Sequence, residues 1–331
     1  MDGLWDLHTH CYSQDYLRLL EDHGGLYKIA RGPTHPVITW AGIPTVTLHP
    51  GTYNWRARLA DPRQAAVDVH FLSTTVPNVY PFPPALQVRA ARVVNDDLAR
   101  WRDGDSAHIR GLASLPMDSD DAVAELERAL GPLGLSGVIL GTHIGTRDLD
   151  DLRYAPVFQR MDALGALVLL HPMVPVAAGA AHLADYDLLS LVGFMNDTTE
   201  AVARLTFSGF FDRYPHIRFV LPQLGGAALF LRGRWQMGTR SRIDVGRTDL
   251  VRPHVYYDCV VFDRAAVRLA VDTVGVAQLV FGSDYPHLGD AETVWAAVAG
   301  AGLNESECAA IAQGNARRML ARVRRADPAP S

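Results

Sequence analysis

Eight short runs of apolar and β-branched residues recur along this chain of 331 residues, with helical periodicity between them. The runs are LWDLHT (4–9), VDVHFLST (67–74), IRGLASL (109–115), SGVILGT (136–142), ALVLLHP (166–172), IRFVLPQ (217–223), VYYDC (255–259) and QLVFGSD (278–284). Helices are predicted between them, for example over residues 84–101, 120–134 and 263–275. Asp120 and Asp263 are expected to cap the last two of these helices.

Eight strands that alternate with helices predict an α/β fold, a (β/α)8 TIM barrel, whose typical size is ~250 residues. The surplus lies in two insertions, residues 11–53 after the first strand and 173–194 after the fifth. An open doubly wound sheet is the alternative, although no GxGxxG motif follows the first strand. We expect one domain over residues 1–321, with residues 11–53 as a lid or pocket wall, and a flexible tail over 322–331.

Composition excludes several classes of function. The net charge of −5 gives no basic surface for nucleic acid or an anionic membrane, and no apolar run is long enough for a membrane span. Lys28 is the only lysine, and it lies in the first insertion, so mechanisms that need a catalytic or bridging lysine are set aside. Three scattered cysteines and no visible signal peptide indicate a cytoplasmic protein without a disulfide framework.

Polar residues at the ends of the first, fifth and eighth strands predict a metal site. His8 and His10 alternate along one strand and therefore point the same way. His171 ends an apolar strand, and Asp284 ends the last one. Each has an ordinary alternative, since strand histidines are common, a core histidine can be hydrogen-bonded, and Asp284 can cap a helix. Together they suit one divalent cation with an open coordination position, most simply Zn2+, while Mn2+, Co2+ or Fe2+ also fit.

With these residues identified, the chain resembles the amidohydrolase superfamily, and within it the branch of aminocarboxymuconate semialdehyde decarboxylase and related aromatic acid decarboxylases. The motifs that carry the resemblance occur in family order over nearly the whole chain: DLHTH, FLSTTVP, NDDLAR, GLASLPMD, GVILGTHIGTRDLD, LLHP, GG and FGSDYP. The resemblance implies that His8, His10, His171 and Asp284 are metal ligands. It also suggests a homodimer and a small-molecule substrate.

The chain departs from this family at the end of the sixth strand, where the family has a histidine and VLPQLGG has Gln223. Glutamine only donates and accepts hydrogen bonds, so it cannot be a general base. Either the metal alone activates its water, or another histidine takes over. His143 is the best-placed candidate, unless its ring merely contacts backbone, and His287 is a weaker one.

The expected substrate contacts also differ from the family pattern. Arg234 matches one family arginine that would hold an acid group, although a solvent-exposed helix arginine is the alternative. The resemblance also implies a second arginine in the first insertion near residues 42–51, but GIPTVTLHPG has none, which indicates a less charged substrate. Trp40, Tyr53 and Trp55 are expected to line an apolar pocket, or else to pack the insertion onto the barrel.

Three functions follow from these residues. The leading hypothesis is a metal-dependent decarboxylase of a small unsaturated or aromatic acid, with Gln223, His143 and Asp284 as catalytic residues. The alternative is a metal-dependent hydrolase of an ester, thioester, amide or lactone that uses metal-bound water, with Gln223 as a hydrogen-bond donor to the oxyanion. The third is a barrel that binds a small molecule without turnover.

Overall fold

The computed structural model describes residues 3–175, 180–238 and 248–321. Eight parallel strands form one sheet in the order β1-β5-β6-β7-β10-β11-β12-β13. Their bounds are β1 (Leu4–His10), β5 (Val67–Ser73), β6 (Ile109–Ala113), β7 (Gly137–Gly141), β10 (Leu167–His171), β11 (Arg218–Leu221), β12 (Val255–Asp258) and β13 (Leu279–Val280). Each predicted strand therefore corresponds to one observed strand, and the predicted barrel is confirmed.

Backbone hydrogen bonds bring the last strand back to the first. The N–H of Leu7 donates to the carbonyl of Phe281 over 3.1 Å, and the N–H of Asp284 donates to the carbonyl of His8 over 2.8 Å. Beyond β13, the chain makes an isolated parallel bridge to β1 between Thr9 and Tyr285. The sheet is thus a nearly closed barrel whose seam lies between its first and last strands.

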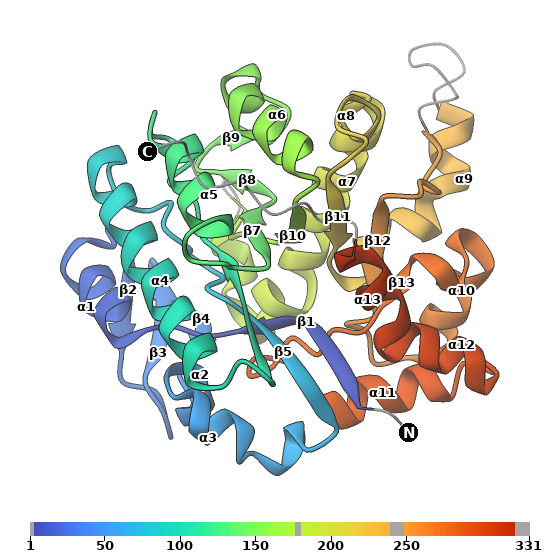
Figure 1. The fold of residues 1–331 in the computed structure, drawn as a ribbon, viewed down its shortest axis with the longest axis horizontal. Coiled ribbons are helices and arrows are strands. Elements are labelled where there is room, and N and C mark those ends of the chain that lie inside the picture. The colour runs from blue at the N-terminus through green and yellow to red at the C-terminus, as the bar shows by residue number, and fades with distance from the viewer. Residues whose placement is uncertain (1–2, 176–179, 239–247, 322–331) are drawn as a thin grey trace.

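Helices surround the barrel on the outside (Figure 1). They are α4 (Pro84–Gly104), α5 (Ala122–Leu130), α6 (Ala155–Leu164), α7 (Phe194–Phe207), α8 (Phe210–Arg213), α9 (Ala228–Gly238), α10 (Arg264–Val274), α11 (Ala291–Ala299), α12 (Glu305–Ala309) and α13 (Asn315–Leu320). The expected cap Asp263 accepts a 2.6 Å bond from the N–H of Ala265. The expectation for Asp120 is wrong, because α5 begins one residue later, with Asp121 as its N-cap and no side-chain capping bond.

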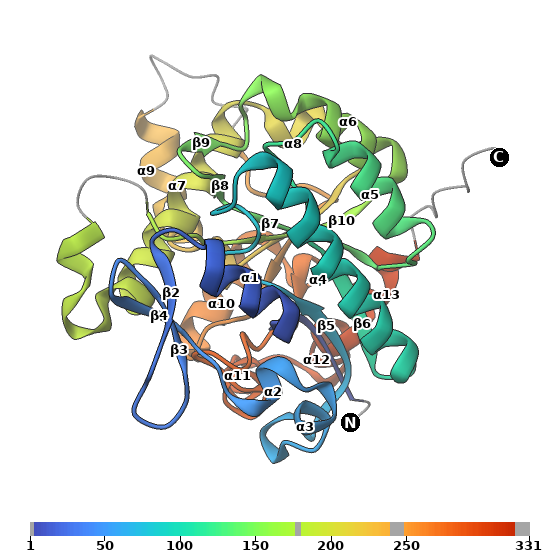
Figure 2. The ribbon, with the colours of Figure 1, turned by 90° about the vertical axis from the view of Figure 1, so that its left-hand side faces the viewer.

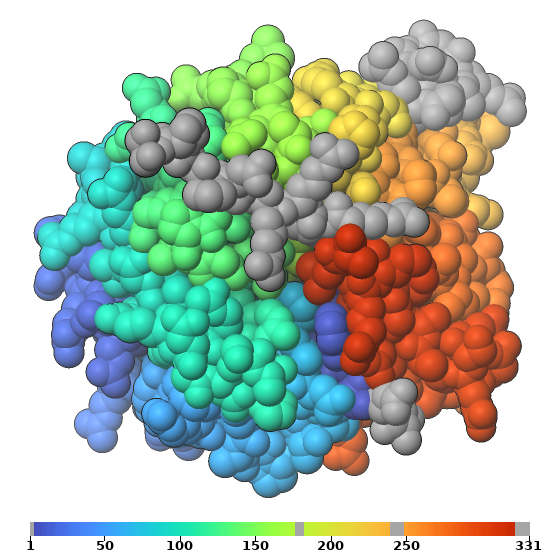
Figure 3. Space-filling model, in the orientation of Figure 1, coloured from blue at the N-terminus to red at the C-terminus, as the bar shows by residue number. Residues whose placement is uncertain are grey.

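The barrel interior is filled by apolar side chains from every strand. This cluster includes Leu7, Val69, Phe71, Leu112, Ile139, Leu167, Leu169, Val220, Tyr256 and Val280. Ala316 and Met319 of α13 join it, and the guanidinium of Arg317 lies 4.5 Å from the ring centroid of Trp5. Helix α13 therefore covers the end of the barrel where β1 begins, as the contact between red and dark blue atoms in Figure 3 shows.

Residues 11–66 add a separate layer beside the barrel. Helix α1 (Gln14–His23) is followed by an antiparallel sheet of β2 (Tyr27–Ala30), β3 (Val37–Trp40) and β4 (Ile43–Thr47), and then by α2 (Pro50–Tyr53) and α3 (Trp55–Leu59). Figure 2 shows this sheet at one side of the molecule, next to α1 and α2. A lid role for residues 11–53 stays a prediction, as does the single domain over residues 1–321.

The connections after β10 and β7 contain short elements of their own. After β10, the short helical turns at Ala180–Leu183, Asp185–Asp187 and Leu189–Gly193 lead into α7, and β8 (His143–Ile144) pairs with β9 (Arg147–Asp148) after β7. The tail expected to be flexible, 322–331, lies outside the described residues. Within the described ranges, no helix combines the length and the apolar character that a membrane crossing requires.

Candidate metal centre and cavity

Four buried side chains meet at the carboxyl ends of the barrel strands. They are His8 and His10 of β1, His171 of β10, and Asp284, which follows β13. One ligand atom from each lies within 4.8 Å of the others. The Oδ1 atom of Asp284 is 3.5 Å from Nε2 of His8 and 3.2 Å from Nε2 of His10. The structure thus brings together the residues that the sequence pattern selected.

An irregularity in β1 turns the two histidines toward this group. From Asp6 to Thr9 the strand advances three residues, while its partner β5 advances only two, from His70 to Leu72. Such a β-bulge reverses the alternation of side chains beyond it. Leu7 consequently packs inside the barrel, and His8 and His10, instead of their odd-numbered neighbours, face the metal site.

The ring of His8 is held from behind by a carboxylate. Its Nδ1 lies 2.6 Å from Oδ2 of Asp258, which ends β12 and is completely buried. The other oxygen of Asp258 accepts bonds from the backbone N–H groups of Gln223 and Val260, over 2.7 and 3.1 Å. A histidine that donates Nδ1–H to a carboxylate presents its Nε2 to a metal, and such pairs are common around metal ligands.

Hydroxyl groups fix the other two rings. Ser73 donates its hydroxyl to the carbonyl of Thr9, so its oxygen accepts from Nδ1 of His10 over 3.0 Å. Nδ1 of His171 lies 2.6 Å from Oγ1 of Thr75 and 2.8 Å from the carbonyl of Pro172. Because a carbonyl only accepts, Nδ1 of His171 carries the hydrogen. In the neutral form of each of the three rings, the hydrogen on Nδ1 leaves Nε2 with its lone pair.

The chemistry of the donor set fits a divalent cation. Nε2 of His8, Nε2 of His10 and Oδ1 of Asp284 are buried and have no hydrogen-bond partner among the described residues. Burial lowers the pKa of His10 and of His171 well below the usual value, which keeps both imidazoles neutral. Burial raises the pKa of Asp284 to about 7. A cation compensates such buried, unpaired groups, so this three-histidine, one-aspartate cluster fits a divalent metal site.

Arg58 of α3 connects the layer formed by residues 11–66 to strand β1, which carries His8 and His10. Its completely buried guanidinium donates to the hydroxyl of Thr9 and to the carbonyls of His10 and Gly51, and it lies 4.7 Å from the ring centroid of Tyr285. It thereby contacts both segments that carry ligands, at His10 itself and at Tyr285, the neighbour of Asp284.

The metal cluster opens onto a largely apolar cavity of about 390 Å3. Its polar lining includes His171, Asp284, Gln223 and His287. The remaining lining residues are Thr45, Val46, Thr75, Val76, Ser190, Leu191, Phe194, Met195, Val260, Val261, Phe262, Asp263, Ala266 and Leu288. Among the described residues, no arginine or lysine lines this cavity. The volume suits a small molecule, and the described part of its walls offers no basic side chain for a second acidic group.

Two residues of the cavity lining have unusual backbone conformations. Asp284 and Gln223 lie in the left-handed region, with φ of 60° and 53°. Gln223 is half-buried, and its Oε1 accepts a 3.2 Å bond from the hydroxyl of Thr198. Non-glycine residues rarely adopt positive φ, and those that do cluster at functional sites. The structure thus places Gln223 at the cavity, as the sequence comparison suggested.

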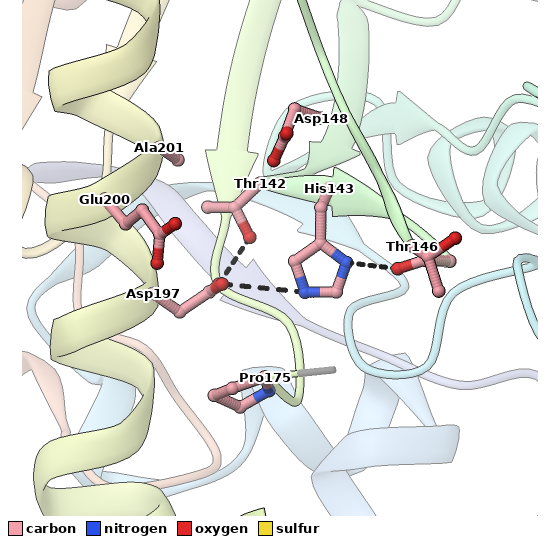
Figure 4. Close-up of a pocket in the computed structure, with 9 residues that line it drawn as sticks. Thr142, His143, Thr146, Asp148, Pro175, Asp197, Glu200 and Ala201 are labelled. Carbon is pink, nitrogen blue, oxygen red and sulfur yellow. Dashed lines mark hydrogen bonds and ion pairs between the residues drawn. The ribbon is translucent and has the colours of Figure 1, made fainter. Parts of the chain in front are cut away.

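His143, the candidate replacement base, lies in a second and smaller cavity of about 150 Å3. Its Nδ1 bonds the carbonyl of Gly145 over 2.8 Å, and its Nε2 is 3.5 Å from Oδ1 of Asp197 (Figure 4). Asp197 also accepts bonds from the hydroxyl of Thr142 and from the N–H of Met173. The structure therefore supports the alternative interpretation, in which the ring of His143 contacts backbone, and it corrects the placement of His143 beside the metal ligands.

The expected substrate contacts lie elsewhere. Arg234 is exposed on α9, and it does not line the cavity at the metal cluster. Trp40 is half-buried in the small sheet, opposite Tyr27. The ring of Trp55 lies under the guanidinium of Arg56, at 4.3 Å. Tyr53 is half-buried on α2 and is also absent from the cavity lining. None of these four residues is among the side chains that line the cavity, so acid binding by Arg234 and a pocket role for Trp40, Tyr53 and Trp55 stay predictions.

Sequence reasoning missed the groups behind the ligands: Asp258, Ser73 and Thr75. Of these three residues, only Asp258 could have been predicted from the sequence. It is an acidic residue near the end of an apolar run, as Asp284 is near the end of the eighth run. His287 was considered a weak candidate base, but it lines the main cavity. Its ring stacks on that of His10, with centroids 5.1 Å apart.

Barrels of this type carry their active sites at the carboxyl ends of the strands, which is where the four clustered side chains lie. Residues 6–322 match the amidohydrolase family, and the chain belongs to that family. It is an enzyme, and the resemblance inferred from its motifs is confirmed. A curated relative, 2-amino-3-carboxymuconate-6-semialdehyde decarboxylase of Dictyostelium discoideum, is 30% identical over 238 residues, which are 69% of this chain and 66% of that protein.

Solved structures agree on the fold. The IDCase of Metarhizium anisopliae in apo form superposes with a TM-score of 0.83 at 24% identity, over 97% of each chain. Dihydroxybenzoic acid decarboxylase from Polaromonas sp. JS666, with bound manganese and the inhibitor 2-nitroresorcinol, gives a TM-score of 0.75 at 22% identity, again over 97% of each chain.

Proposed function

We propose that this protein is a metal-dependent decarboxylase of a small unsaturated or aromatic acid that carries a single carboxylate. The observation that carries this proposal is the cluster of three oriented imidazoles and one carboxylate at the end of a largely apolar cavity. Relatives named as decarboxylases of unsaturated or aromatic acids support the reaction type. The absence of arginine and lysine from the described cavity lining supports a substrate without a second acidic group.

We propose that His8, His10, His171 and Asp284 hold one divalent cation. Zn2+ suits this donor set, and Mn2+, which the Polaromonas enzyme binds, is the alternative. When bound, the cation supplies a Lewis acid that polarises an oxygen of the substrate. We also expect a cytoplasmic homodimer, from the sparse cysteines and from the family resemblance.

The reaction replaces a carbon–carbon bond with a carbon–hydrogen bond. The substrate carboxylate leaves as CO2, its bonding electrons remain on the carbon, and that carbon then takes a proton. Asp284 is the one carboxyl group that belongs both to the metal cluster and to the cavity lining, so it is the candidate proton carrier. Gln223, whose Oε1 is held by Thr198, directs its amide N–H group toward a substrate oxygen.

The same lining favours a second candidate function, the hydrolysis of an uncharged ester, thioester, amide or lactone. Such a substrate needs no cationic contact, and the amide of Gln223 would donate to the oxygen that becomes negative. Hydrolysis transfers an oxygen atom from water to the product, whereas decarboxylation does not. Turnover in 18O-labelled water therefore separates the two reactions.

The proposal is tested with purified protein loaded with Zn2+ or Mn2+ and a panel of monocarboxylic aromatic, hydroxyaromatic and unsaturated acids. We expect release of CO2 from at least one acid and strong loss of this activity in Asp284→Asn. Matched dicarboxylic acids should react more slowly, because the described cavity lining has no arginine or lysine for the second group. If no acid in the panel releases CO2 while a neutral ester incorporates 18O, the hydrolase proposal replaces the decarboxylase.

A further inference from the structure

His287 stands out in the main cavity because its polar atoms have nothing to bond. Both ring nitrogens are buried, and neither has a hydrogen-bond partner among the described residues, although the residue lines the cavity. A buried polar group without a hydrogen-bond partner destabilises the folded protein, so such groups usually have one. Three other cavity or cluster histidines behave differently, since each has its Nδ1 occupied by a protein group. We therefore infer that a molecule bound in the cavity supplies the hydrogen-bond partner of His287.

The position of the ring is fixed next to the metal cluster. It stacks on His10 with an interplanar angle of 17°, and the ring of Tyr12 lies 6.3 Å away. The backbone N–H of His287 donates to the carbonyl of Asp284 over 2.9 Å, which ties the residue to the turn that carries a ligand. A substrate whose carboxylate reaches the metal cluster thus brings its adjoining atoms close to this ring.

The chemistry of the ring selects the kind of group that fits. A neutral imidazole offers one donor and one acceptor, and a hydroxyl or amino group can pair with either nitrogen. A second carboxylate would instead need a cationic partner, and no described lining residue is an arginine or a lysine. We propose that His287 is a specificity-determining residue that hydrogen-bonds a hydroxyl or amino substituent of the acid. This inference rests on the proposed function and names its substrate class more closely.

The test compares benzoate with 2-hydroxybenzoate, 3-hydroxybenzoate and 2-aminobenzoate as probes of the Mn2+-loaded protein. Binding is measured by calorimetry, and CO2 release is recorded separately. At least one substituted acid should bind about tenfold more tightly than benzoate, the equivalent of one net hydrogen bond. In His287→Phe this preference should disappear, while affinity for benzoate stays similar. His287→Gln, which keeps a donor and an acceptor, should restore part of it.

Two controls separate His287 from the metal and from the fold. The metal content and melting temperature of each variant are measured, because a preference caused by chelation would survive in a folded, loaded His287→Phe protein. His49→Phe replaces a histidine that contacts His35 outside the cavity, so it should leave the preference unchanged. A preference that persists in His287→Phe, or is absent in the wild type, overturns the inference. If the preference is lost on mutation but no CO2 appears, the role of His287 stands and the proposed reaction fails.

Discussion

Two groups of polar side chains lie at the carboxyl ends of the barrel strands, and they differ in what the Nε2 atoms of their histidines face. In the metal cluster, every Nδ1 is bonded from behind, by Asp258, Ser73 or Thr75, while Nε2 faces the other ligands. In the smaller cavity, Nδ1 of His143 bonds its own loop, and its Nε2 faces Asp197. In the first group three imidazoles and a carboxylate converge on one point, whereas in the second a single Nε2, without a hydrogen bond among the described residues, faces one carboxylate at 3.5 Å.

The largest effect that tests this comparison comes from removing a ligand. We expect Asp284→Ala and His171→Ala to weaken metal binding by more than about 100-fold, since even the loss of an outer partner costs ~10–100-fold. Asp197→Ala, in the smaller cavity, should retain the metal. The measurement is metal content after dialysis, followed by competition with a chelator. Equal losses in Asp197→Ala would show that the two groups are not distinct.

A smaller effect is expected from Asp258→Asn. The Asn oxygen can still accept from the N–H groups of Gln223 and Val260, but its NH2 group then faces Nδ1 of His8. His8 must therefore move its hydrogen to Nε2, which blocks the metal-binding lone pair. Metal affinity should fall by about 10–100-fold.

The control for this prediction is Ser73→Ala, which removes a neutral partner of His10 and should cost less affinity than Asp258→Asn. Chelator competition at one pH gives both values. If Asp258→Asn keeps wild-type affinity, the orientation of His8 does not depend on the carboxylate.

The smallest effect concerns a histidine that belongs to neither group. His70 is buried in β5, its Nδ1 has no partner among the described residues, and burial lowers its pKa to about 3. Below pH 6.5, His70 binds a proton in the unfolded chain but stays neutral in the folded protein. The contribution of His70 to stability should therefore be constant above pH 6.5 and fall by about 1.4 kcal/mol per pH unit below it, down to pH 3.

Urea unfolding of the metal-free wild type and of His70→Leu at pH 7.5 and 5.5 measures this dependence. Between these two pH values, the wild type should lose about 1.4 kcal/mol more of its free energy of unfolding than the variant. Parallel losses in both proteins would assign the acid sensitivity to other groups.

The parts of this molecule that follow local patterns could be predicted from its sequence. All eight barrel strands were recognisable as apolar runs, and His8, His10, His171 and Asp284 could be grouped because parallel strands end at the same face. The orientation of the two histidines in β1 was expected from simple alternation. Alternation places His8 and His10 on the same side of the strand. Whether that side faces inward is decided by the bulge, and the bulge depends on pairing with β5.

Features that depend on distant segments could not be predicted in this way. The bond between His8 and Asp258 joins residues that no sequence spacing relates. The burial of Arg58 and the cavity position of His287 likewise depend on how loops pack over the barrel. Trp40, Tyr53 and Trp55 were expected at the pocket because aromatic residues suit apolar walls, but composition cannot distinguish a pocket wall from packing inside an insertion.

The seam between the first and last strands has a consequence for how the protein is made. Two ligands come from the first barrel strand, and Asp284 follows the last one, which spans only Leu279–Val280. A nascent chain therefore has no complete binding site until the last barrel strand has been made. Once the site has formed, a bound cation stabilises the closure between β1 and the short β13, because any ion that binds only the folded state stabilises that state by mass action. Chains that end before the last strand would lack this stabilisation by the cation.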